Sequence, residues 1–194
     1  FGSIIHKTLE DLFKPYAQRD KQGVYVQPAP PPVREKDVLK MLDTFKSSLY
    51  KGFLDHFGQD ESLFKTGKNR LSYEMAIEIT KNVLKKELEF IQVLKEPLYI
   101  EQIEAEMHTE ILVPFEQGTR TLHFKGYIDR IDRIGNRYRV IDYKTGKVKK
   151  EQVVYSTLAK GLIPSFLKSK HAFQLALYCM FFKDKYGVLP DEAK

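Results

Sequence analysis

Two apolar, β-branched runs separated by a short turn sequence constrain the fold of this chain more than any other feature. The runs span Leu122 to Ile134 and Tyr138 to Tyr143, and Gly135-Asn136 lies between them. A glycine–asparagine pair between two such runs is typical of a tight turn. We therefore expect the two runs to pair as an antiparallel hairpin.

Three charged residues lie on this predicted hairpin. Asp142 and Lys144 are two residues apart, so they are expected on one face of the second strand, and the hairpin returns Asp129 to the side of Asp142. Two carboxylates suit a hard cation such as Mg²⁺ or Mn²⁺, and a neighbouring lysine can hold water or neutralise a phosphate. A solvated strand face is the alternative, but Val140 and Ile141 indicate a central strand where unpaired charges are costly.

Other segments complete a recognisable constellation. They are Gly2-Ser-Ile-Ile-His6, Gly126-Tyr-Ile-Asp129, Asp142-Tyr-Lys144 and Gln174-Leu-Ala-Leu-Tyr178. Together they resemble the PD-(D/E)XK nuclease superfamily, specifically its RecB/AddB-like branch, from His6 to Tyr178. The resemblance implies an α/β fold: a restriction-endonuclease-like core with a central mixed β-sheet flanked by helices.

The resemblance also implies a role for individual residues. Asp129 and Asp142 are expected to bind the metal, the Tyr143 carbonyl and His6 to add ligands, and Lys144 to act as the catalytic lysine. The family places a further glutamate on the preceding strand, where Glu104, Glu106 and Glu110 share one face. We prefer Glu104, with Glu106 next, and spacing does not decide between them.

Each of these roles competes with a structural one. His6 lies on an amphipathic helix and fits a core histidine as well as a ligand. Gln174 and Tyr178 are one helical turn apart. The resemblance implies that they contact DNA or order the active site, and a partly buried polar pair is the alternative. Asp132 lies near Arg130 and Arg133, so a structural ion pair is expected for it.

The positive charge of the chain is concentrated around the predicted site. The net charge is +6, and residues 116–150 hold ten Lys/Arg against four Asp/Glu. This concentration of positive charge would attract a polyanion such as DNA. We expect Lys147, Lys149 and Lys150 to grip the nucleic-acid backbone.

Residues 1–194 are expected to form a single nuclease domain cut from a longer protein, with a helical insertion at residues 18–96. Periodicity predicts helices at residues 3–18, 35–57, 70–94 and 168–186, and strands at 98–114, 122–134 and 138–144. In the resembling family another strand follows the last helix, and we expect this chain to end before it.

The composition of the chain limits which cofactors, location and partners are expected. The single cysteine, Cys179, excludes an internal disulfide and cannot supply the four ligands of an iron–sulfur cluster, and it suggests a reducing, cytoplasmic location. No apolar run approaches the roughly 20 residues of a membrane helix, so no membrane partner is expected.

The sequence therefore predicts a Mg²⁺- or Mn²⁺-dependent DNA nuclease, most simply an exonuclease, that acts in recombination and repair with a helicase domain or subunit. Two alternatives stay open. One is a catalytically inactive DNA-binding or scaffolding domain of a helicase–nuclease complex, and the other is a Mg²⁺-dependent enzyme that acts on another phosphate substrate.

Overall fold

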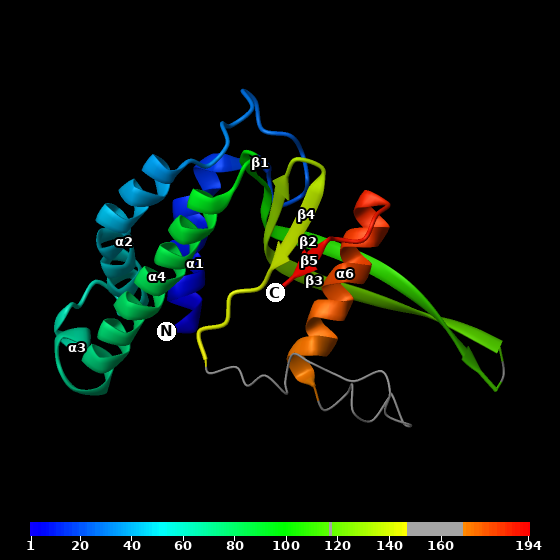
Figure 1. Ribbon diagram of the computed structural model, residues 1–194. Coiled ribbons are helices and arrows are strands. Elements are labelled where there is room, and N and C mark those ends of the chain that lie inside the picture. Colours follow the sequence, from blue (N-terminus) through cyan, green and yellow to red (C-terminus); the bar gives the residue numbers. More distant parts are fainter. Residues whose placement is uncertain (117, 147–168) are drawn as a thin grey trace.

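A computed structural model describes residues 1–116, 118–146 and 169–194 of the chain (Figure 1). The helices are α1 (Gly2–Phe13), α2 (Glu35–His56), α3 (Ser62–Lys65), α4 (Gly67–Val93) and α6 (Lys170–Tyr186), with a 3₁₀ turn, η1 (Lys14–Tyr16). The strands are β1 (Ala17–Arg19), β2 (Leu98–Phe115), β3 (Gly118–Ile134), β4 (Arg137–Ile141) and β5 (Glu192–Ala193). The elements predicted from the sequence are present, most with ends that shift by a few residues. The first helix ends at Phe13, and residues 17 and 18, which were predicted as helix, belong to β1.

The described strands form one mixed sheet in the order β1-β2-β3-β4-β5. The central pairs β2–β3 and β3–β4 are antiparallel, and the edge pairs β1–β2 and β4–β5 are parallel. This sheet with flanking helices confirms the predicted α/β class. Two expectations were incomplete: β1 was not predicted, and an edge strand does follow the last helix, because Glu192–Ala193 pairs with β4.

The predicted hairpin forms between β3 and β4. Gly135 occupies the turn with φ +58°, a left-handed conformation that glycine adopts without steric cost. The register pairs Ile134 with Arg137 and Arg130 with Ile141. Strand β4 ends at Ile141, so Asp142 and Lys144 lie just beyond the strand and not on it as predicted. The chain there is attached to the sheet edge through Asp142, whose N–H donates to the Lys194 carbonyl at 2.8 Å.

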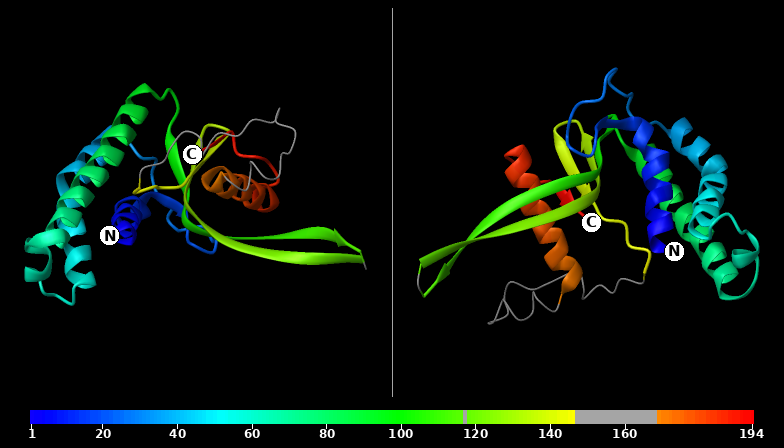
Figure 2. Two further views of the ribbon diagram at one scale, coloured as in Figure 1. Left: turned by 90° about the horizontal axis from the view of Figure 1, so that it is seen from below. Right: turned by 180° about the vertical axis from the view of Figure 1, so that it is seen from behind.

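The β2–β3 pair is longer than the rest of the sheet. Its distal half projects from the body of the molecule as a two-stranded arm, which is seen from two further directions in Figure 2. The proximal half carries the buried residues of both strands and belongs to the core. The proximal half is therefore the part that positions neighbouring side chains rigidly.

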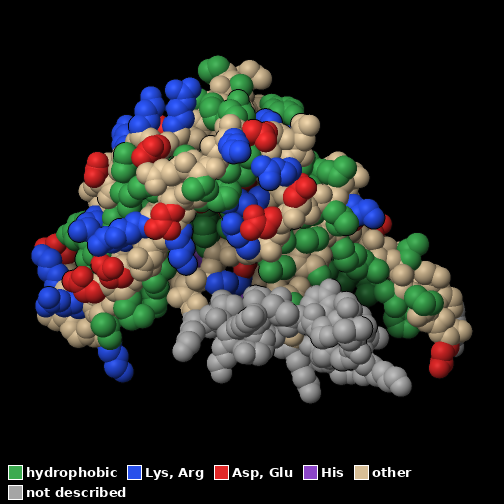
Figure 3. All heavy atoms as spheres, viewed as in Figure 1, with side chains coloured by type: hydrophobic (Ala, Val, Ile, Leu, Met, Phe, Trp, Pro, Cys, Tyr) green, Lys and Arg blue, Asp and Glu red, His purple; other side chains and the backbone are tan. Residues whose placement is uncertain are grey.

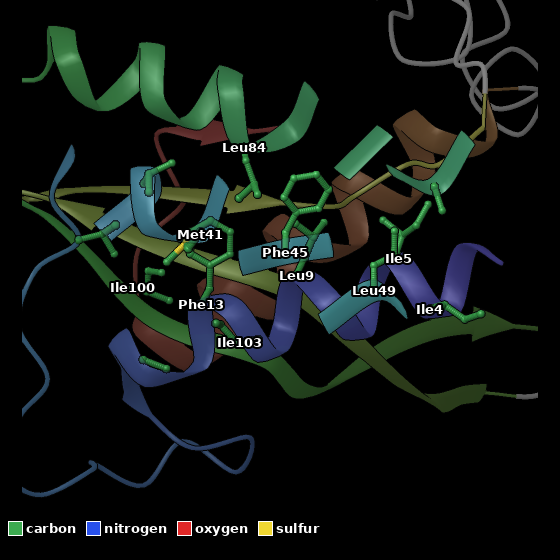
Figure 4. Packing of buried hydrophobic residues seen from close by; sticks show 14 of the residues in the cluster. Ile4, Ile5, Leu9, Phe13, Met41, Phe45, Leu49, Leu84, Ile100 and Ile103 are labelled. Atoms are coloured by element: carbon green, nitrogen blue, oxygen red, sulfur yellow. The ribbon is translucent and has the colours of Figure 1, made fainter. Parts of the chain in front are cut away.

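One face of the sheet is covered by the helices that precede it in the chain (Figure 1). Helix α1 contributes Ile5, Leu9 and Phe13 to a buried cluster that also contains side chains of α2, α4 and β2 (Figure 4). The labelled partners are Met41, Phe45, Leu49, Leu84, Ile100 and Ile103. Burial of this apolar surface fixes α1 against β2, which is what places the amino-terminal residues beside the sheet.

The opposite face is covered by α6. Phe181 and Phe182 pack with Ile128, Ile131 and other residues of β2 to β4 in a second buried cluster. A Cβ atom at Gly126 would lie 2.7 Å from Phe181 Cε2, so only glycine allows α6 this close to β3. The glycine of the Gly-x-x-Asp segment is thus needed for packing.

A buried network of charges joins α4 to the hairpin. Asp132, fully buried, accepts hydrogen bonds from Arg130 Nε at 2.6 Å and from Arg139 Nη2 at 2.6 Å. Glu87 of α4 accepts from Arg130 Nη2 at 2.6 Å. The prediction that Asp132 forms a structural ion pair is confirmed.

Candidate active site and metal centre

Three side chains from three elements meet beside the proximal half of the β2–β3 pair. His6 of α1, Glu104 of β2 and Asp129 of β3 each place a ligand atom within 4.8 Å of the others. His6 Nδ1 lies 3.4 Å from Asp129 Oδ1. All three residues are partly buried, so the group is screened less than a surface cluster but stays accessible.

The backbone of Glu104 departs from regular strand geometry. The ladder pairs Ile103 with Arg130 and Ala105 with Ile128, and Glu104 and Asp129 lie between these pairs. Glu104 has φ +49°, which is uncommon outside glycine and costs on the order of 1–3 kcal/mol. Such strain is typical of functional positions, because the surrounding structure must maintain it.

Charge and burial shift the protonation of this group. Burial raises the pKa of Glu104, and the neighbouring Asp129 carboxylate raises it further. The pKa of His6 is raised mainly by its hydrogen bond to Asp129, against the effect of burial, and a hydrogen bond to the Tyr143 carbonyl adds to the rise. The negative charge of Asp129 contributes to both shifts, and a cation bound beside it would relieve that charge.

Asp142 and Lys144 form a second group, beside the first. Lys144 Nζ forms an ion pair with Asp142 Oδ2. Burial raises the pKa of Asp142, the lysine opposes that rise, and the charge of Asp129 adds to it. Although both residues follow the strand, their side chains meet as the sequence predicted. Within the described residues Asp142 is not part of the His6–Glu104–Asp129 group.

Helix α6 contacts this second group through the two residues singled out in the sequence. The Gln174 side chain accepts from Lys144 Nζ at 2.9 Å and donates to Asp142 Oδ1 at 3.3 Å and to the Tyr178 hydroxyl at 2.7 Å. Tyr178 is only 7% exposed, and burial raises its pKa to about 12. These contacts join Gln174 and Tyr178 as a partly buried polar pair that also holds the Asp142–Lys144 group.

The family model described as the PD-(D/E)XK nuclease superfamily matches residues 1–193 of the chain. The chain belongs to the PD-(D/E)XK nuclease superfamily. No curated protein and no solved structure matches it.

Nucleases of this superfamily use divalent metals, and the His6–Glu104–Asp129 group fits one. Ligands on opposite sides of a Mg²⁺ or Ca²⁺-sized ion, at roughly 2.1–2.4 Å from it, lie about 4.2–4.8 Å apart. The three ligand atoms satisfy this limit, and two of them are the carboxylate oxygens that hard cations prefer. The Tyr143 carbonyl, which accepts from His6, adds a third oxygen and a fourth possible ligand atom beside the group.

The structure distinguishes Glu104 from Glu106, between which the spacing in the sequence did not decide. Glu106 Oε1 pairs with Lys125 Nζ at 2.6 Å and with His108 Nε2 at 3.1 Å, and these contacts lower its pKa. Glu104 instead faces His6 and Asp129. In this nuclease, Glu104 is therefore the glutamate of the pair that lies at the candidate metal centre.

Glu10 lines a pocket beside the centre and Lys21 pairs with Glu10, and neither residue was singled out from the sequence. The pocket is lined by Gly2, Ser3, His6, Lys7, Glu10, Glu104 and Asp129. Glu10 is 7% exposed and holds Lys7 Nζ at 3.0 Å and Lys21 Nζ at 3.3 Å. Its spacing of one helical turn after His6 was a usable signal for Glu10. Lys21 lies in a loop, and its place depends on a distant residue: the Gln102 side chain donates to the Lys21 carbonyl at 2.8 Å.

The inference from charge distribution needs a correction. Arg130 and Arg139, counted in the basic stretch, are buried in the network with Asp132 and Glu87, so they present no charge to a substrate. Over the face seen in Figure 3, basic and acidic side chains are interspersed. Lys147, Lys149 and Lys150 lie outside the described residues.

None of the helices in the described parts of the chain is both long enough and apolar enough to span a membrane.

Proposed function

We propose that this PD-(D/E)XK nuclease is a Mg²⁺- or Mn²⁺-dependent deoxyribonuclease that hydrolyses phosphodiester bonds. The observation that carries the proposal is the placement of the His6–Glu104–Asp129 group beside the Asp142–Lys144 pair. A ligand set and a cationic side chain thus lie together at the accessible end of the sheet. Metal-dependent hydrolysis of a phosphodiester requires both a set of metal ligands and a cationic side chain near the reacting groups.

Each side chain receives a role in this proposal. His6, Glu104, Asp129 and the Tyr143 carbonyl would hold the ion, and Asp142 would add a ligand from the neighbouring Asp142–Lys144 pair. The ion when bound would supply a Lewis acid for a phosphodiester oxygen. Lys144 holds the attacking water and helps to remove its proton, and Asp142 keeps the lysine in place through their ion pair. Gln174 and Tyr178 order that pair from α6.

The finer assignments rest on the resemblance of the motifs to the RecB/AddB-like branch. We propose an exonuclease that processes DNA ends in recombination and repair, in the cytoplasm, together with a helicase domain or subunit. Lys147, Lys149 and Lys150 would grip the DNA backbone. We also propose that residues 1–194 are one domain and that residues 18–96 are an insertion in it.

The test is incubation of end-labelled linear DNA and of circular DNA with the purified chain and Mn²⁺, with EDTA as the control. Degradation of linear DNA alone supports an exonuclease, and cleavage of the circle identifies an endonuclease. Lys144→Ala should abolish either activity. Lys81→Ala is the matched control, because Lys81 pairs with Glu78 on α4, away from the proposed ligands. Cleavage by Lys144→Ala at the wild-type rate would contradict the mechanism.

The same preparation separates the alternatives. DNA binding without Mn²⁺ affinity or cleavage would identify a DNA-binding or scaffolding domain. Hydrolysis of a nucleotide with no cleavage of a strand would identify an enzyme for another phosphate substrate.

A further inference from the structure

Tyr143 stands between the two proposed catalytic residues Asp142 and Lys144, yet its side chain is engaged elsewhere. Its phenol oxygen accepts a hydrogen bond from Arg130 Nη1 at 3.2 Å. Burial raises the pKa of this phenol to about 12, so it stays protonated at neutral pH. The side chain of Tyr143 is therefore a neutral anchor directed at a buried cation.

Arg130 is held on several sides. It is 1% exposed, and its guanidinium donates to Asp132 Oδ1 at 2.6 Å and to Glu87 Oε1 at 2.6 Å. Its Cζ lies 4.2 Å from the centre of the Phe13 ring, over the face of the ring. A planar guanidinium with contacts in so many directions has little freedom to move, so its donor to Tyr143 is fixed in space.

The segment that carries Asp142 and Lys144 needs such an anchor. It has left β4, and its described backbone bonds are Asp142 N–H to the Lys194 carbonyl at 2.8 Å, Tyr143 N–H to Asp129 Oδ2 at 2.6 Å, and the bond that the Tyr143 carbonyl accepts from His6. The second of these bonds uses a carboxylate that is itself a proposed metal ligand. The phenol–Arg130 bond attaches the segment to the core without engaging a ligand side chain.

We propose that Arg130 is a positioning residue: through the Tyr143 phenol it holds the segment of Asp142 and Lys144 against the metal centre. Glu87 extends this support to α4, so the helical layer helps to place the catalytic segment. The proposal rests on the proposed function, since it assigns the support of the same site.

A purely structural role makes a different prediction. If the Arg130–Tyr143 hydrogen bond contributed only stability, its removal would change the protein no more than the loss of a hydrogen bond from any other buried tyrosine hydroxyl. Tyr186 offers that comparison. Burial raises its pKa to about 12 as well, and its hydroxyl donates to Gln102 Oε1 at 3.2 Å. Tyr186→Phe is thus a matched control for Tyr143→Phe.

The experiment compares wild type, Tyr143→Phe and Tyr186→Phe in two assays. Amide hydrogen exchange over residues 142–146 reads the position of the segment without reference to catalysis. The second assay is the steady-state cleavage of DNA with Mn²⁺. For Tyr143→Phe we expect exchange about 10-fold faster in this segment and kcat lower by about 10-fold or more, with KM for DNA unchanged, because one charge-assisted hydrogen bond corresponds to about that factor. Tyr186→Phe should match wild type in both assays.

Either result can overturn the proposal. Exchange over residues 142–146 that is equal in the two variants shows that the phenol does not hold the segment. A kcat of Tyr143→Phe equal to that of Tyr186→Phe shows that the segment does not need it. Absence of cleavage by wild type would instead reject the proposed function, and the exchange assay would then decide the positioning role by itself.

Discussion

The N–H of Tyr143 donates a hydrogen bond of 2.6 Å to Asp129 Oδ2. This bond joins the Gly-x-x-Asp segment of β3 to the Asp-Tyr-Lys segment that follows β4. It leaves the other carboxylate oxygen of Asp129 facing His6 at 3.4 Å. One aspartate therefore links both halves of the hairpin to the amino-terminal helix, and the proposed metal centre is built around it.

Glu104 and Glu106 provide an internal comparison for the metal centre. We expect Glu104→Gln to weaken Mn²⁺ binding by about 10-fold or more and to lower cleavage by about 100-fold, because a charged ligand becomes neutral. Glu106→Gln should stay close to wild type, since Glu106 pairs with Lys125 and not with the centre. Titration calorimetry with Mn²⁺ and a cleavage assay check both variants. Equal effects of the two substitutions would place the ion elsewhere.

Metal binding should stabilise the fold. Glu104 and Asp129 lie close enough together for the charge of Asp129 to raise the pKa of Glu104. An ion that binds only the folded state adds about 2.7 kcal/mol at a concentration 100 times its Kd. Thermal unfolding with and without Mn²⁺ measures this gain, and EDTA should reverse it. In Asp129→Asn the gain should be much smaller; a full gain there would argue against this ligand set.

The buried network predicts a large loss of stability on removal of its central acid. Asp132→Asn leaves Arg130 and Arg139 in the interior with less compensating charge, at a cost of about 3–5 kcal/mol. Glu96→Gln is the control, because Glu96 pairs with Arg137 at the surface and should cost less than about 1 kcal/mol. Urea unfolding measures both variants. A small loss for Asp132→Asn would mean that the network relaxes when its charge is removed.

Gly126 should resist substitution for steric reasons. Its added Cβ would lie 2.7 Å from Phe181 Cε2, so Gly126→Ala must displace α6 or the ring, at a cost of about 1–3 kcal/mol. Gly146→Ala is the control, because a Cβ there meets no atom of the described residues within 4 Å. Chemical unfolding of the two variants makes the comparison. If both lose the same stability, the packing of α6 on Gly126 is not the cause.

Glu10 should contribute stability that depends on pH. Burial raises the pKa of its carboxyl, but the ammonium groups of Lys7 and Lys21 outweigh burial and leave the pKa lowered. A lowered folded-state pKa stabilises the protein above the unfolded value near 4.5, and this contribution disappears as the pH falls through the lowered pKa. The difference in unfolding free energy between wild type and Glu10→Gln should thus be larger at pH 7 than at pH 3. A difference that is independent of pH would show that charge is not involved.

Local patterns predicted the elements well because each depends on near neighbours. The β-branched runs and Gly135 specify the hairpin, and the apolar stripes specify α2 and α4. Prediction failed for elements whose formation depends on segments far apart in the chain. Strand β1 is three residues long and exists only through its pairing with β2, and β5 depends in the same way on β4. The end of β4 at Ile141 was missed because apolar residues continue to Tyr143.

The sequence by itself determined the α/β class and the superfamily and supplied the candidate site residues, because residue type and short-range spacing carry that information. The tertiary structure decided which of these residues meet. It placed Glu104 and not Glu106 beside His6 and Asp129, and it removed Arg130 and Arg139 from the substrate surface into the core. Packing between segments far apart in the chain decides two things: which way a side chain points at a distorted strand position, and which side chains are buried between layers. Local sequence patterns therefore do not predict either of them.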